Sequence, residues 1–248
     1  MKCDIMVKDN DKKLNTNSNL YIILYSSVMV VVVAFLLAFV SQTLRPAQEA
    51  NVALDKKKQI LASLNIRNLD DETAARTYSE VVVADEIIDR SGNVVNAGQA
   101  GGESAGFTLN SADYKDGSLA LFVCRVDGQT KYVVPVYGMG LWGPIWGYIA
   151  IDEDKNTIYG AYFNHDSETA GLGAEIKDSK EWQDKFVGKK IFTDADKETV
   201  ALAVKKSSDV KNPATEVDGV TGATLTSNGV SDMLGECLGE YKVFLNEK

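Results

Sequence analysis

The stretch Asp218-Gly219-Val220-Thr221-Gly222-Ala223-Thr224 places two small residues directly before a threonine. From about residue 230 to 245, apolar residues recur every three or four positions, which predicts an amphipathic helix. These residues are Val230, Met233, Leu234, Cys237, Leu238, Tyr241, Phe244 and Leu245. Thr224 is therefore expected on a tight, exposed turn just before a helix.

A helix that starts here would favour an anion beside Thr224. Thr226, Ser227 and Asn228 are each acceptable N-caps. The unpaired N–H groups and the positive dipole end of a helix N-terminus favour a phosphate. An ordinary capped turn is the alternative, because glycine and alanine before a cap are common turn chemistry.

An uncharged apolar segment, Leu20 to Val40, lies near the N-terminus. As a helix it would be roughly 31 Å long, enough to cross the hydrocarbon core of a bilayer. A cleaved signal peptide is the alternative, but its apolar region is shorter, and no small-residue cleavage site follows. We expect a retained single span. Its orientation does not follow from charge, since four lysines precede it (Lys2, Lys8, Lys12, Lys13) and four basic residues follow it (Arg45, Lys56, Lys57, Lys58).

The composition restricts the class of the part that follows. The remaining residues of the 248-residue chain suffice for one domain with a buried core. A net charge of −9 argues against a nucleic-acid partner. Cys3, Cys124 and Cys237 match no metal-ligand spacing, and we predict no metal site. A disulfide between Cys124 and Cys237 stays open.

Recognised catalytic patterns are missing from the sequence. It has no dinucleotide-binding fingerprint or P-loop where a strand would lead into a helix. His165, the single histidine, has no nucleophile motif to serve, so we interpret it as a hydrogen-bonding loop residue rather than a general base. We therefore predict no catalytic residue in this chain.

Short apolar runs separated by turn residues predict a domain of mostly antiparallel strands flanked by helices, which is an α+β fold. Strands are expected at residues 81–88, 119–126, 132–137, 145–151, 157–164 and near 200–204. Pro46 is expected to begin a linker helix that runs to about Leu64, Ser179 to cap a short helix, and residues 89–110 to form a loop. The resulting division is an N-terminal segment 1–19, a transmembrane helix 20–40, a helical linker 41–70 and a domain 71–248.

Two glycine-rich stretches can form a pocket. In residues 137–147, glycines permit close backbone approach, and Trp142 and Trp146 offer flat apolar surfaces, although both tryptophans could instead be core residues of a bent strand. In residues 165–174, Glu168 and Thr169 can bond to the edge of a heterocycle or to neighbouring amides.

Together these features resemble the FMN-binding domains of membrane redox complexes. In that family the last threonine of a Ser/Thr-Gly-Ala-Thr motif is esterified to the phosphate of FMN, and Thr224 is the matching residue. With the anchor and both glycine-rich stretches, the chain is similar to the family of the C subunit of the sodium-translocating NADH:quinone oxidoreductase. The G subunit of the Rnf complex is the nearest rival. Ala170 stands where the common family form has proline.

The resemblance implies a flavin cavity and covalent FMN on Thr224. The residues expected to form the flavin cavity are Thr221, Gly222, Ala223, Leu141, Trp142, Glu168, Thr169, Gly171, Leu172 and Gly173. The flavin would relay electrons within a complex that couples NADH oxidation and quinone reduction to Na⁺ export. Two alternatives stay open: a flavin-free, membrane-anchored interaction subunit, and a hydrolase or ligand-binding domain tethered by its helix.

The resemblance also implies a setting for the chain. Expected partners are the other membrane, flavin and iron–sulfur subunits, a flavin transferase that attaches FMN, and a lipid bilayer around residues 20–40. The chain would be a single-pass protein of a bacterial inner membrane, with its flavin domain on the periplasmic side.

Overall fold

The computed structural model describes residues 16–193 and 196–247. Cys3, the four lysines before the predicted span and most of the predicted segment 1–19 lie outside the described residues. The chain divides into two compact units, one ending at Val52 and the other beginning at Ala53. The second unit carries the sheet and its covering helices.

The helix α1, Asn19–Ser63, is by length and composition able to cross a membrane, and the described part of the chain has one such helix. Its apolar stretch includes the predicted span. The expectation that Pro46 begins a separate helix is wrong, because Pro46 lies inside α1. Proline removes one backbone hydrogen bond, but Arg45 and Glu49 form a 2.8 Å ion pair over this turn and the helix continues.

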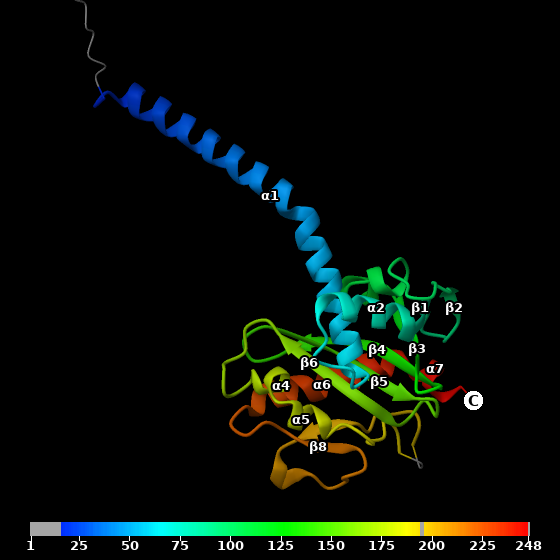
Figure 1. The fold of residues 1–248 in the computed structure, drawn as a ribbon. Helices are drawn as coiled ribbons and strands as arrows, with labels where there is room; N and C mark the ends of the chain where they lie inside the picture. The colour runs from blue at the N-terminus through cyan, green and yellow to red at the C-terminus, as the bar shows by residue number, and fades with distance from the viewer. Residues whose placement is uncertain (1–15, 194–195, 248) are drawn as a thin grey trace, which may run out of the picture. The chain divides into compact units, whose positions relative to one another are not determined.

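Six antiparallel strands form the sheet, in the spatial order β2-β1-β3-β4-β5-β6 (Figure 1). Their bounds are Val82–Ile88 (β1), Val94–Asn96 (β2), Leu119–Val126 (β3), Gln129–Met139 (β4), Pro144–Asp152 (β5) and Ile158–His165 (β6). The antiparallel α+β prediction is confirmed. The strand β2 lies in the predicted loop 89–110; its residues are all exposed, so no alternation of apolar and polar residues announces it.

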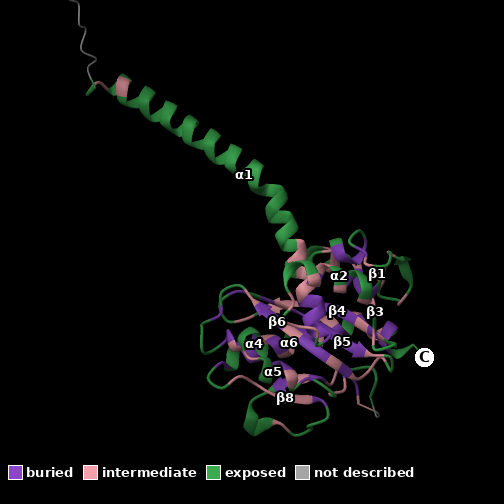
Figure 2. Ribbon diagram, viewed as in Figure 1, coloured by how far each residue is buried: buried purple, intermediate pink, exposed green. Residues whose placement is uncertain are grey.

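Both faces of the sheet are buried, which follows from the alternation of side chains along each strand. In β3, Leu121 belongs to the core under α6, whereas its neighbour Phe122 belongs to the core under α2. Figure 2 shows the buried residues concentrated in the sheet and the segments that cover it. Gly160 illustrates how closely the end of α1 packs, since an ideal Cβ there would lie 2.3 Å from the Ser63 carbonyl oxygen.

Short helices and turns cover the sheet. They are α2 (Asp71–Val81), η1 (Gly106–Thr108), α3 (Ser111–Lys115), α4 (Glu175–Asp178), α5 (Lys180–Asp184), η2 (Ser207–Asp209), α6 (Thr224–Glu240) and α7 (Lys242–Asn246). Ser179 caps α5 as predicted, accepting a 3.2 Å hydrogen bond from the Trp182 N–H. A small parallel pair, β7 (Ala203–Lys205) with β8 (Glu216–Asp218), leads into the turn before α6.

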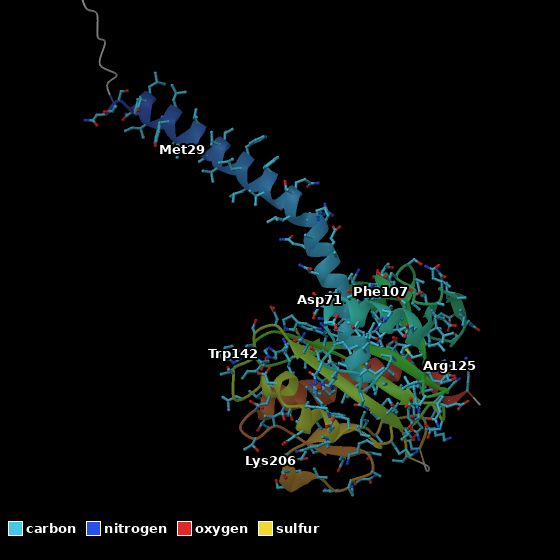
Figure 3. The ribbon with its side chains drawn as sticks, viewed as in Figure 1. Met29, Asp71, Phe107, Arg125, Trp142 and Lys206 are labelled. Atoms are coloured by element: carbon cyan, nitrogen blue, oxygen red, sulfur yellow. The ribbon has the colours of Figure 1, made fainter. Side chains whose placement is uncertain are left out.

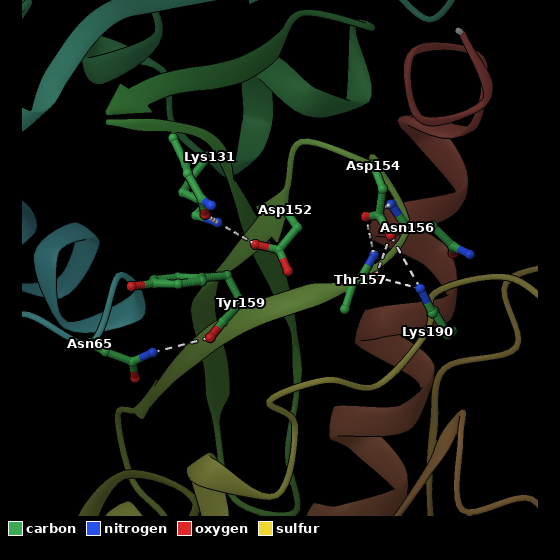
Figure 4. A network of polar contacts seen from close by, with 9 residues as sticks. Asn65, Lys131, Asp152, Asp154, Asn156, Thr157, Tyr159 and Lys190 are labelled. Carbon is green, nitrogen blue, oxygen red and sulfur yellow. Dashed lines mark hydrogen bonds and ion pairs between the residues drawn. The ribbon is translucent and has the colours of Figure 1, made fainter. Parts of the chain in front are cut away.

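The turn between β5 and β6 is a closed polar network (Figure 4). The Asp154 carboxylate accepts hydrogen bonds from the backbone N–H groups of Asn156 and Thr157, at 3.0 and 2.7 Å, and pairs with Lys190 at 3.1 Å. Beside it, Lys131 is buried and pairs with Asp152 at 2.5 Å. These contacts fix one end of the hairpin and leave the other end, at residues 140–143 and 166–173, as open loops.

Candidate functional site

Thr224 is the first residue of α6 and is exposed. Ala223 stands at the N-cap and provides no side-chain hydrogen bond. Within the part of the chain that the structure describes, no hydrogen bond uses the N–H groups of Thr224, Leu225 or Thr226. An exposed hydroxyl therefore lies beside three unpaired donors at the positive end of a 17-residue helix, a favourable position for an anion.

The expectation that residues 226–228 cap a helix beginning near Val230 is wrong, because α6 already begins at Thr224. Tertiary contacts occupy two of the three side chains. Thr226 donates its hydroxyl to Glu168, and the Ser227 hydroxyl accepts a 3.1 Å hydrogen bond from the Val220 N–H. Cap propensity alone therefore does not locate the start of α6, because these hydroxyls bond to Glu168 and Val220 instead of capping the helix.

The turn that presents Thr224 has a shape that few residues allow. Gly222 has a φ of +79°, which disfavours any residue with a Cβ. An ideal Cβ at Gly222 would also lie 3.0 Å from Leu172 Cδ2, so the loop 166–173 lies close to the turn at this point. Thr221 is exposed, whereas Ala223 is buried. The structure thus places the turn at Gly222 next to Leu172; that these residues form one site stays a prediction.

Glu168 is the centre of the arrangement and is 7% exposed. Its Oε2 accepts a 2.5 Å hydrogen bond from Thr226 Oγ1, and its Oε1 accepts a 2.8 Å hydrogen bond from the Trp142 N–H. One carboxylate therefore ties the loop after β6 to the loop after β4 and to the first turn of α6. Ideal Cβ atoms at Gly140 and Gly173 would lie 2.5 and 2.4 Å from its two oxygens, so the close approach requires glycine at both positions.

The loop 166–173 is stabilised mainly through its backbone. His165 Nδ1 accepts a 3.2 Å hydrogen bond from the Glu168 N–H, in agreement with its interpretation as a hydrogen-bonding residue. The Thr169 carbonyl accepts from the N–H groups of Leu172 and Ala174, at 3.1 and 3.0 Å. Gly171 supplies a φ of +73°. This leaves the Thr169 and Leu172 side chains exposed beside the turn.

Large apolar side chains are exposed on the segments that Glu168 and Gly222 bring together. They are Met139, Leu141, Trp142, Leu172 and Leu225, which we call the apolar rim, and Trp142 is 65% exposed. Figure 3 shows Trp142 on the loop that follows β4. Exposed apolar groups clustered beside polar ones are typical of a binding surface. Trp146, by contrast, is half-buried and donates its indole N–H to Gln59 at 3.0 Å.

Sequence reasoning missed three members of this site, the first of which is Met139 of the apolar rim. Leu225, 61% exposed, follows Thr224 directly and belongs to the apolar rim. Thr226 completes the pairing of Glu168. Leu225 could have been found from the sequence, because a large apolar residue directly after the exposed Thr224 suggests a binding surface. No local pattern could signal Thr226, because its partner lies 58 residues away in the sequence.

The two described cysteines are free. Cys124 is buried in the core under α2, whereas Cys237 packs at the core under α6, on the other side of the sheet. Burial raises the pKa of both thiols. Among the described residues, no group of three His, Cys, Asp or Glu side chains could hold a metal ion.

Comparison with known proteins agrees with this geometry. Residues 140–239 match the family model described as an FMN-binding domain. Over 211 residues the chain is 30% identical to the C subunit of the Na(+)-translocating NADH-quinone reductase of Vibrio vulnificus, covering 79% of this chain and 82% of that protein. The C subunit of the same enzyme from Chlamydia trachomatis is 41% identical over 126 residues, which are 46% of this chain and 40% of the relative.

A solved structure extends the similarity to the fold. The crystal structure of the corresponding C subunit from Parabacteroides distasonis superimposes with a TM-score of 0.75 at 38% identity. It covers 83% of this chain and 98% of that one.

Proposed function

This chain belongs to the family of C subunits of the Na⁺-translocating NADH-quinone reductase, and we propose that it carries FMN as a phosphoester on the hydroxyl of Thr224. The observation that supports this most directly is the exposed Thr224 hydroxyl beside the unpaired N–H groups of α6. A phosphate attached there needs no further charged residue, because the helix end supplies donors and a positive dipole.

The remaining site residues fit a flat ring system attached at this point. The phosphate would lie over the turn from Thr221 to Ala223, where Gly222 permits close backbone approach. The apolar rim, with Leu141, Trp142 and Leu172 among its members, would contact the faces of the ring. The exposed Thr169 and the backbone at Gly171 and Gly173 would border its edge, and Glu168 would hold these loops in place.

When bound, FMN would supply reversible electron transfer between neighbouring redox centres. The chain's own part is to fix the position of the ring and to leave one edge accessible to a neighbouring protein of the complex. Because the apolar rim is exposed, it suits electron transfer to a neighbouring protein in direct contact better than it suits an enclosed substrate site. Covalent attachment would keep the cofactor in place where free FMN is not replenished.

The setting follows from the family. We propose a single-pass subunit anchored through residues 20–40, with the domain 71–248 and its flavin on the periplasmic side of a bacterial inner membrane. The linker 41–70 would join the two. Partners would be the membrane, flavin and iron–sulfur subunits of the complex that couples NADH oxidation and quinone reduction to Na⁺ export. A flavin transferase would recognise Asp218 together with Gly222, Ala223 and Thr224.

Replacing Thr224 by valine tests the attachment, because valine keeps the shape and removes only the hydroxyl. We expect the wild-type chain, produced together with a flavin transferase, to show an intact mass increased by one FMN less one water and a fluorescent band in denaturing gels. The Thr224→Val chain should show neither. Thr199→Val is the matched control, since Thr199 is an exposed threonine outside the site, and it should stay flavinylated.

Two results would contradict the proposal. Flavin that survives denaturation on Thr224→Val would place the bond elsewhere. An unmodified wild-type chain from the native host would favour the flavin-free, membrane-anchored interaction subunit.

A further inference from the structure

The turn before Thr224 is closed by three hydrogen bonds that follow one another around it. The Val220 N–H donates to Ser227 Oγ at 3.1 Å, and the Val220 carbonyl accepts from the Ala223 N–H at 3.1 Å. The Ala223 carbonyl in turn accepts from the Ser227 N–H at 2.9 Å. Thr224 therefore lies within a closed ring of bonds that starts and ends at Ser227.

Ser227 is the side chain that completes this ring. Among the described residues, no other side chain forms a hydrogen bond with the backbone of residues 219–223. Ser227 is 4% exposed, so water does not readily replace its hydroxyl as an acceptor. Without that hydroxyl, the Val220 N–H would lose its partner, and backbone bonds alone would hold the turn.

Gly219 makes room for the contact. An ideal Cβ at Gly219 would lie 2.8 Å from Ser227 Oγ and 2.9 Å from Ser227 Cβ, closer than unbonded atoms pack. The Gly219 N–H also donates to the Lys205 carbonyl at 2.7 Å, which ties the start of the turn to β7. The turn is thus fixed at one end by β7 and at the other by Ser227 of α6.

The attachment of FMN makes the orientation of the Thr224 hydroxyl important. Thr224 Oγ forms a bond to the phosphorus of the FMN phosphate, and that phosphorus loses its bond to a leaving group, which is AMP when the donor is a flavin dinucleotide. The hydroxyl proton passes to a base. A hydroxyl that is already held in place reacts faster in such a displacement than one that must first be ordered.

We infer that Ser227 is a positioning residue for flavin attachment. By accepting the Val220 N–H, it holds the turn in the conformation that presents the Thr224 hydroxyl to a flavin transferase. Ser227 acts through the backbone of the turn and not on the reacting atoms. The inference rests on the proposed attachment of FMN to Thr224, and it assigns a role to a side chain three residues further along the chain.

Ser227→Ala tests the role, and Ser231→Ala is the matched control. Ser231 lies one turn later on α6, and its Oγ also accepts a backbone hydrogen bond at 3.1 Å, from the Val204 N–H. The two variants therefore remove the same kind of bond from the same helix, and chemical denaturation should show a similar loss of stability for both.

The rate of attachment separates the two variants. Full-length chains in lipid nanodiscs are mixed with a purified flavin transferase and flavin adenine dinucleotide, and intact mass follows the reaction. We expect kcat to fall about fivefold for Ser227→Ala, the effect of one neutral hydrogen bond. The KM for the chain should stay unchanged, because a misplaced hydroxyl slows the chemical step. Ser231→Ala should react with wild-type kcat and KM.

A second pair of variants perturbs the same contact from the other side. Gly219→Ala places a methyl group against Ser227 and should also lower kcat. Gly235→Ala is its control, since an ideal Cβ at Gly235 of α6 meets no atom within 4 Å, and it should keep the wild-type rate.

The outcomes distinguish this inference from the proposed function. A wild-type chain that stays unmodified would contradict attachment at Thr224 itself. If the wild type is flavinylated and Ser227→Ala reacts with the same kcat, only the positioning role is overturned. Equal slowing of Ser231→Ala, or a change confined to KM, would overturn it as well.

Discussion

The strands β5 and β6 end in opposite ways. At their shared turn, residues 153–157, the Asp154 carboxylate accepts backbone N–H groups and pairs with Lys190. At their other end, next to the loops 140–143 and 166–173, the first turn of α6 has three N–H groups without a partner among the described residues, and five large apolar side chains are exposed. The same two strands thus connect a closed turn to an open site.

The difference indicates that the closed turn contributes to stability, whereas the open end provides groups for binding. At the closed turn, the Asp154 carboxylate accepts from the backbone of Asn156 and Thr157 within the hairpin and also from Lys190, 36 residues away, so its polar groups are paired. At the open end, the buried Glu168 joins three segments and leaves the groups around them free to bind something else. Binding sites are typically preorganised in this way: a fully hydrogen-bonded side chain, here Glu168, fixes the segments that carry the free binding groups.

Replacing Glu168 by alanine should produce the largest effect. The change removes two hydrogen bonds to a buried carboxylate and leaves the Thr226 hydroxyl and the Trp142 N–H without acceptors. Hydrogen bonds to charged groups contribute about 1.5–3 kcal/mol each, so the free energy of unfolding should fall by about 3 kcal/mol. Chemical denaturation of the full chain, followed by tryptophan fluorescence, measures it.

Glu153→Ala is the matched control, because Glu153 is an exposed glutamate of the closed turn. It should change the free energy of unfolding by less than about 0.5 kcal/mol. If Glu168→Ala is equally mild, Glu168 does not organise the open end, and the contrast between the two ends fails.

A moderate effect is expected from Asp154→Ala at the closed turn. The loss of its backbone and side-chain acceptor contacts should lower the free energy of unfolding by about 1 kcal/mol, while flavin attachment at Thr224 stays complete. Intact mass and chemical denaturation of one preparation measure both. Reduced flavinylation of this variant would show that the two ends are coupled.

Asp154 also predicts a pH dependence. Burial alone would raise the pKa of Asp154, but hydrogen bonds from Thr157 and Asn156 and the contact with Lys190 outweigh it and hold the pKa well below 3.8. A depressed carboxylate pKa stabilises the folded state above the unfolded value, and this contribution is lost as the pH falls below about 3.8. The stability difference between wild type and Asp154→Asn should therefore shrink in acid, and a constant difference from pH 6 to pH 2.5 would contradict the assignment.

The sequence was a better guide to the closed parts than to the open site. Strand β3 is predicted residue for residue, and β5 and β6 to within one residue at each end, because buried apolar runs between turn residues reflect local preferences. The start of α6 and the role of Thr226 are not predictable in this way, since a loop 58 residues earlier determines them. Pro46 is a further case in which a local rule fails: proline favours the first turn of a helix, but here it lies inside α1.

Most site residues were selected through the resemblance to the FMN-binding family. At Gly222, Gly171 and Gly173 the structure adds a physical reason for the residue type, because positive φ values or close contacts disfavour a Cβ there. Glu168 was selected as a possible ligand of a heterocycle. The structure adds that both of its oxygens already accept hydrogen bonds from the protein, which makes it a positioning residue in our proposal.

The smallest effect on stability should come from Trp142→Ala, which sharpens the comparison most. Trp142 is 65% exposed and loses little buried area when truncated, so the free energy of unfolding should change by less than about 0.5 kcal/mol. If the apolar rim contacts the ring of a flavin on Thr224, flavinylation should remain complete while the visible absorption and emission of the flavin change, because a flat apolar neighbour is lost. Val187→Ala, a truncation of an exposed apolar residue outside the rim, should leave both spectra unaltered. Identical flavin spectra for Trp142→Ala and the wild type would show that Trp142 does not contact the flavin ring. The exposure of the apolar rim would then need another explanation.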